Sequence, residues 1–206
     1  MIHRICLLLL IFNFIYADGV SSLKLFLKQK KIFYANFVQD ISSKHQITRS
    51  SGKVFILRPN RFIWEYDTNN HISQKIISDG DNIYMIDNEL EQVTCSKINK
   101  VLGSYPALIL SGNDGINRFY FIKNINLNDS NLDWVSLLPR ELNENNGFQM
   151  IEIAFDKNNR NLVKMNFIDN FGTKSTITFS NQSIKNVVNN GQFRFVKPKG
   201  YDLINN

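Results

Sequence analysis

The chain has 206 residues and a formal net charge of +6, and this length is sufficient for one domain with a substantial core. A hydrophobic fraction of 43% with 20% charged residues excludes a disordered chain, and ten glycines with four prolines exclude a collagen-like one. The pI of about 9.3 is compatible with acidic partners or a membrane surface but identifies neither.

Residues 1–17 are predicted to be a cleaved secretory signal peptide. They place Arg4 ahead of an apolar run from Ile5 to Ile15, and Ala17 stands at a suitable cleavage position. The run is too short to span a bilayer, although an uncleaved anchor and a cut after Gly19 are alternatives. We therefore expect a single mature domain over residues 18–206.

Cysteine usage predicts a mature chain without an intrachain disulfide. Cys6 lies inside the leader, so Cys95 is the only cysteine that remains after cleavage. Cys6 also comes too early, and ahead of the apolar run, to become a lipidated first residue. We expect a soluble monomer that is indifferent to reductant.

The mature chain begins with a predicted helix, since Leu23, Phe26 and Leu27 share one helical face. Period-two alternation and turn residues then predict about ten strands, and helical spacing over residues 97–112 predicts short apolar helices. Asp79-Gly80-Asp81-Asn82 predicts a hairpin turn. The strand-like segments from which these strands are expected cover 33–40, 52–59, 61–66, 73–79, 82–87, 89–94, 119–127, 134–139, 148–156, 162–169, 173–180 and 193–198.

The strand over 52–59 is unusual because both of its faces are apolar. Val54 and Ile56 point to one side, and Phe55 and Leu57 point to the other. An antiparallel sheet normally alternates apolar and polar residues. A helix-covered sheet with an ordinary core is favoured by the pattern alone, and a cavity lined by apolar side chains is the alternative.

No motif for enzymatic chemistry is present: the sequence has no nucleophile elbow, phosphate loop, dinucleotide fingerprint or zinc-protease helix. His45 and His71 lie in polar, turn-like surroundings, and Glu89 and Glu91 share one predicted strand face. Basic residues are scattered, so nucleic acid is not expected. We expect no cofactor and no metal ion.

Six segments together resemble the periplasmic lipoprotein carrier family, LolA. The segment LRPNRFIWEY is the most recognisable, and the others follow the family's order over about residues 21–204. The other segments are FYANFVQD, IISDGDNIYMIDNELEQV, YPALILSG, DWVSLLP and FRFVKPKGYDLI.

The resemblance implies an α+β fold, an incomplete antiparallel barrel of about ten to eleven strands closed by short lid helices. Its apolar interior would receive the acyl chains of lipoproteins that an inner-membrane ABC transporter complex releases. The protein would then carry this cargo through the periplasm to an outer-membrane receptor. Such a chaperone is not an enzyme.

The resemblance also implies roles for particular residues. Arg58 matches the family arginine that bonds to carbonyls of the lid helix, and Phe62 matches an aromatic residue near the cavity entrance and the transporter contact. Trp64 shares the face of Phe62, so cargo contact and core packing are both open. Further residues expected to contact the cavity or a partner are Phe55, Leu57, Pro106, Leu108, Ile109 and Leu110.

Two alternatives remain. An outer-membrane lipoprotein receptor of the same fold should carry a lipidated cysteine directly after the signal, where this chain has Asp18 and Gly19. An envelope hydrolase would have to use His45 or His71.

Overall fold

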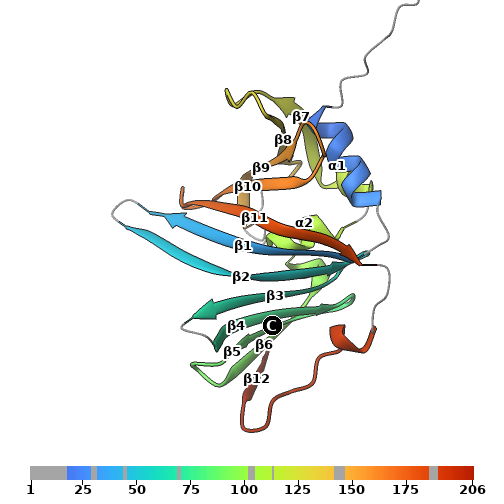
Figure 1. Cartoon of the computed structure of the whole chain (residues 1–206). Coiled ribbons are helices and arrows are strands. Elements are labelled where there is room, and N and C mark those ends of the chain that lie inside the picture. Colours follow the sequence, from blue (N-terminus) through green and yellow to red (C-terminus); the bar gives the residue numbers. More distant parts are fainter. Residues whose placement is uncertain are drawn as a thin grey trace, which may run out of the picture.

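The computed structural model describes residues 18–28, 32–43, 46–68, 71–101, 105–112, 114–141, 147–185 and 190–206. The leader over 1–17 and His45 lie outside the described residues. Within them, twelve strands form one sheet in the order β12-β6-β5-β4-β3-β2-β1-β11-β10-β9-β8-β7 (Figure 1). The strands are β1 (Ile32–Ser42), β2 (Ile47–Leu57), β3 (Arg61–Thr68), β4 (His71–Asp79), β5 (Asn82–Asp87), β6 (Gln92–Lys97), β7 (Tyr120–Ile125), β8 (Leu132–Pro139), β9 (Phe148–Asp156), β10 (Leu162–Asp169), β11 (Lys174–Lys185) and β12 (Asp202–Asn205).

The sheet is open and almost wholly antiparallel, so the predicted class of fold is confirmed. It has twelve strands where about ten to eleven were expected, and its end strands are β7 and β12. The additional strand, β12, lies parallel to β6. The strand expected over 193–198 is wrong: only Phe193 belongs to a regular element, the 3₁₀ helix η3 (Asn190–Phe193). Residues 194–198 do not pair with the sheet, and Phe195 among them packs against one of its faces.

Short helices cover one face of this sheet, which we call the inner face; the opposite face is the outer face. The helix α1 (Gly19–Lys28) buries Leu23, Phe26 and Leu27 and lies against β7, β8 and β9. The helix α2 (Pro106–Ser111) follows the 3₁₀ helix η1 (Ile98–Lys100) and precedes the 3₁₀ helix η2 (Asp114–Arg118). Among the described residues, no helix is both long and apolar enough to cross a membrane.

The C-terminal segment, residues 190–206, covers part of the outer face. Phe193 packs with Ile32 and Ile63, and Phe55 and Leu57 pack against this cluster. The two apolar faces of β2 therefore have separate partners, the core on one side and the C-terminal segment on the other. Sequence alternation could identify both apolar faces but not the distant segment that covers one of them.

The same segment continues over the outer face of β4, β5 and β6. The rings of Phe195 and Tyr84 stack in parallel with their centroids 4.0 Å apart. The Tyr201 hydroxyl donates a hydrogen bond to Asn88 Oδ1 at 3.0 Å, and β12 then pairs with β6. The C-terminal segment thus covers the outer face at this end of the sheet and supplies its end strand.

Gly52 in β2 is required by close packing. A Cβ at this position would collide with the Glu65 carbonyl oxygen of β3 and lie 2.9 Å from the Phe37 ring. We expect Gly52→Ala to lower the free energy of unfolding by about 3 kcal/mol, because neither backbone nor packed ring can yield cheaply. Urea unfolding measures this, and Ser51→Ala is the control because Ser51 is its exposed neighbour. Equal stability of both variants would contradict the packing.

Candidate functional site

The inner face is a continuous apolar surface built by strand alternation. Along β1, Phe33, Ala35 and Phe37 are buried on this side, and Val54 and Ile56 continue the surface on β2. Aromatic rings contact one another across strands, as in Phe37 and Trp64 at 4.6 Å between centroids. Because one cluster also includes residues of β4, β5 and β7–β11, the apolar lining extends across nearly the whole sheet.

The helix α2 lies within this apolar lining. Leu108, Ile109 and Leu110 are all buried, although three consecutive residues of a helix point in different directions. The helix is therefore surrounded by apolar groups and contacts β2 and β3. Pro106 is its first residue and is half-buried. The leucine and isoleucine side chains of α2, named from the sequence as cavity or partner contacts, are thus themselves buried in this apolar lining.

A turn between β2 and β3 holds the end of α2. The backbone N–H of Asn60 donates a hydrogen bond to the carbonyl oxygen of Ser111, the last residue of α2, at 2.8 Å. The turn begins at Arg58, and Pro59 ends the strand pairing because it lacks an N–H group. The segment LRPNRFIWEY, which was the most recognisable in the sequence, therefore also contacts the end of α2.

Arg58 is buried between this turn and α1. Its side chain is 7% exposed, and the guanidinium carbon lies 4.2 Å above the centre of the Phe26 ring. Burial lowers the pKa of Arg58 to about 10. A lowered pKa means that the charged guanidinium is less stable in the folded protein than in the unfolded chain. Burial of Arg58 therefore opposes folding at every pH below about 10, where the side chain is charged in both states. The bonding of Arg58 to carbonyls of the lid helix stays a prediction.

Phe62 and Trp64 lie inside the apolar cluster with exposed fractions of 0% and 2%. Phe62 was expected near a cavity entrance, and here its side chain is fully covered; its contact with cargo or a transporter stays a prediction. Phe55 and Leu57 lie on the outer face, so they do not line the same interior. The structure brings Phe62, Trp64 and the residues of α2 into one cluster, which Arg58 joins through Phe26.

Two polar side chains on the inner face were not singled out from the sequence. The Tyr66 hydroxyl donates a hydrogen bond to Gln39 Oε1 at 2.8 Å. Burial raises the pKa of Tyr66 to about 12. Tyr66 comes two residues after Trp64, and Gln39 comes two residues after Phe37, so alternation alone places both on the inner face. The sequence could therefore have indicated this pair.

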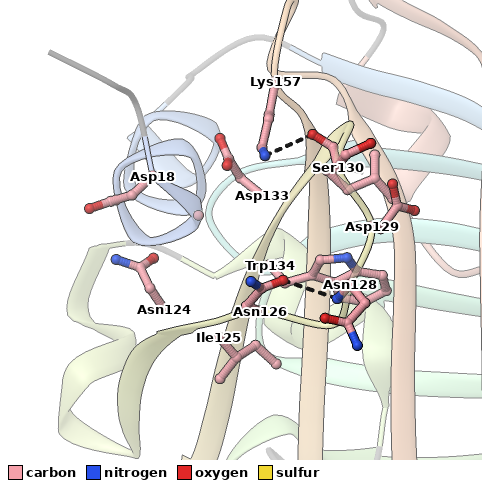
Figure 2. A pocket seen from close by; sticks show the side chains of 12 residues that line it. Asp18, Asn124, Ile125, Asn126, Asn128, Asp129, Ser130, Asp133, Trp134 and Lys157 are labelled. Atoms are coloured by element: carbon pink, nitrogen blue, oxygen red, sulfur yellow. Dashed lines mark hydrogen bonds between the residues drawn. The ribbon is translucent and has the colours of Figure 1, made fainter. Parts of the chain in front are cut away.

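A polar cleft of about 480 Å³ lies where the start of α1 meets the β7–β8 loop. Figure 2 shows Lys157, whose ammonium group donates a hydrogen bond to the Ser130 carbonyl oxygen at 2.8 Å. A backbone hydrogen bond from Ser21 lowers the pKa of Asp18, and burial raises the pKa of Asp133. With carboxylates, amides and an ammonium group around it, this cleft differs in chemistry from the apolar inner face.

The carboxylates and histidines of the described ranges do not form a cluster of three or more metal-ion ligands. His71 begins β4. Glu89 and Glu91 lie in the turn before β6, so the strand face predicted for them is wrong. Glu91 has a φ of 50°, which belongs to a turn and not to a strand.

This chain thus has an open, mainly antiparallel sheet whose apolar inner face is covered by short helices. These features define a class of proteins with a hydrophobic interior between sheet and helices. The sequence model of the family described as outer membrane lipoprotein carrier protein LolA matches residues 28–196. This chain belongs to that family.

Relatives support the assignment over nearly the full length. An outer-membrane lipoprotein carrier protein from Chromobacterium violaceum is 35% identical over 91% of this chain and 88% of its own length. One from Nitrosomonas europaea is 32% identical over 91% and 89%. A Vibrio parahaemolyticus crystal structure, of a domain provisionally described as an outer membrane lipoprotein-sorting protein, has a TM-score of 0.54 at 10% identity. It covers 84% of this chain and 94% of that one, and it shows the fold alone.

Proposed function

We propose that this chain is a soluble, monomeric periplasmic carrier that shelters the acyl chains of lipoproteins. An inner-membrane ABC transporter complex would supply the cargo, and an outer-membrane receptor would accept it. The observation that carries this proposal is the continuous apolar inner face with the apolar helix α2 buried within it. The relatives named as outer-membrane lipoprotein carrier proteins support it.

In such a carrier, the acyl chains of the cargo would replace apolar side chains of the protein itself. Each acyl CH₂ group removed from water is worth about 0.8 kcal/mol, which would make an empty apolar interior bind very tightly. Here the leucine and isoleucine side chains of α2 already occupy the interior. Cargo must displace them, so the net affinity is the difference between two similar apolar contacts. A carrier with this design can hold acyl chains out of water and still release them.

The residues around the turn would set this balance. The Asn60–Ser111 hydrogen bond and the Arg58–Phe26 contact both favour the docked helix, and both are local enough to break without unfolding the sheet. Arg58 would accordingly control the lid, whereas Phe62, Trp64 and the residues of α2 would contact cargo. None of these roles requires a catalytic group, a metal ion or a cofactor, and we propose no enzymatic activity.

Extraction of the protein purified from cells tests the proposal. Organic solvent should release acyl chains that remain attached to an intact lipoprotein. Recovery of free fatty acid with de-acylated protein would point to a hydrolase instead. An N-terminal lipid on the mature chain, seen by mass spectrometry, would move the assignment to the receptor of the same fold.

A further inference from the structure

A line of apolar side chains crosses the outer face of β7–β10, where an antiparallel sheet normally presents polar residues to solvent. Phe121 of β7 pairs with Leu138 of β8, and Met150 of β9 pairs with Ile168 of β10. Leu137 pairs with Ile151, so Leu138 and Met150 are neighbours in the same line. We call Phe121, Leu138, Met150 and Ile168 the outer stripe.

The outer stripe is accessible. Phe121 is 54% exposed, and the other three side chains are half-buried. At the other end of the sheet, the apolar outer face of β3–β6 is covered by the C-terminal segment, through Phe193, Phe195 and Tyr201. The chain thus covers one outer apolar surface with its own residues and presents a second one to solvent.

Basic side chains border the outer stripe at both ends. The Arg140 guanidinium lies 4.0 Å above the Phe121 ring, and its Nε donates a hydrogen bond to the Asn117 carbonyl oxygen at 2.8 Å. Lys123 follows two residues after Phe121 on the same face, and Lys174 pairs with Ile168. Glu152, in the next row of the sheet, accepts a hydrogen bond from Asn166 Nδ2 at 3.1 Å. A complementary surface is therefore apolar in its centre and acidic at its margins.

The dimensions favour a helix as the partner element. Neighbouring strands lie about 4.8 Å apart, so four residues on four strands form a line of about 14 Å across the strands. An α-helix laid along this line presents side chains about every 5.4 Å, so apolar residues at i, i+4 and i+7 would meet the stripe. An added β-strand would instead bind at a sheet edge, which this surface is not.

We propose that the outer stripe is a docking surface for an amphipathic helix of a partner protein, whose apolar face is flanked by Asp and Glu. The surface lies on the opposite face from the acyl-chain site, so its use does not depend on the proposed carrier function. The basic residues would accelerate association and select the acidic partner, while the Phe121 side chain would supply the central apolar contact.

A binding experiment with two synthetic helices tests this proposal on the full mature chain. One peptide carries leucines flanked by glutamates, and the other has lysines in place of the glutamates. We expect the acidic peptide to bind at least about tenfold more tightly, and its affinity to fall as salt is raised. Phe121→Ser and Arg140→Glu should each weaken it about tenfold or more. Ile47→Ser is the matched control, since Ile47 is an apolar residue of β2 with 72% exposure.

Several outcomes would overturn the proposal. Equal binding of both peptides, or equal binding to the Phe121→Ser protein, would show that the stripe does not select an acidic helix. Binding to anionic phospholipid vesicles that requires Phe121, without peptide binding, would make the surface a membrane contact. Concentration-dependent dimers lost in Phe121→Ser would assign it to a second copy. Acyl-chain extraction from the same variants reports on the carrier function separately.

Discussion

Replacing Arg58 with leucine should abolish delivery of cargo while leaving loading intact. The charged side chain that we propose favours the docked helix α2 is lost, and an apolar one takes its place among apolar groups. An open, loaded form then has less tendency to close and expel its cargo. Hydrogen bonds to charged groups are worth about 1.5–3 kcal/mol each, so the loss of one or two shifts the equilibrium by tenfold or more. A two-step assay measures this: the first step is release of a lipoprotein from inner-membrane vesicles, and the second is its transfer to outer membranes.

Stability separates this effect from a folding defect. Burial lowers the pKa of Arg58 to about 10, so the charged side chain opposes folding at neutral pH. Arg58→Leu should therefore change the free energy of unfolding little, because relief of this desolvation offsets the lost contacts to the docked helix. Arg61→Leu is the control, because Arg61 begins β3 three residues later and is only half-buried. A loss of loading in Arg58→Leu, or an equal loss of delivery in both variants, would contradict lid control by Arg58.

Phe62→Glu should have the opposite effect and abolish loading. Phe62 is fully buried among apolar side chains, so a carboxylate there must either lose its hydration or hold the interior open to water. An unpaired buried charge costs about 3–5 kcal/mol, and we expect a loss of this size in the free energy of unfolding at neutral pH. The variant should release no lipoprotein from inner-membrane vesicles.

The pH dependence identifies the carboxylate as the cause. Burial raises the pKa of a carboxyl group in the folded state. The destabilisation should therefore be complete at pH values above this raised pKa, diminish as the pH falls through it, and be absent below about pH 4.3, the ordinary pKa of glutamate. Phe62→Leu keeps an apolar side chain and should show neither this pH dependence nor a loss of loading. If the glutamate variant loads normally, Phe62 does not contact the cargo or the donor complex.

Local patterns predicted the parts of this molecule that depend on near neighbours. Alternation placed Phe62 and Trp64 on one face of β3, and Pro106 with Gly112 bounded the helix α2 correctly. The hairpin at Asp79–Asn82 is confirmed by Gly80, which has a φ of 112° that suits glycine. Each of these features follows from residues a few positions apart.

Contacts between distant parts of the chain were beyond sequence patterns. Nothing near Phe55 or Leu57 indicates that Phe193 will cover their side of the sheet, and nothing near Arg58 points to Phe26. The strand β12 was missed because all four of its residues are exposed, which removes the alternation that marks a half-buried strand. Prediction of the lid residues depended on resemblance to a family, whereas their burial inside the sheet needed the structure.

The position of β1 in the sheet has a consequence for how the molecule forms. Its central ladder joins β1 to β11, with Ile32 opposite Lys185 and Ser42 opposite Lys174. Ribosomal synthesis must therefore reach the last fifth of the chain before the two halves of the sheet can unite. Pairings over such sequence distances form slowly, and unpaired edges stay open to other chains in the meantime. The complete sheet of such a nascent chain forms only when synthesis is nearly finished, and an incompletely folded polypeptide is the form that a narrow protein-conducting channel can accept.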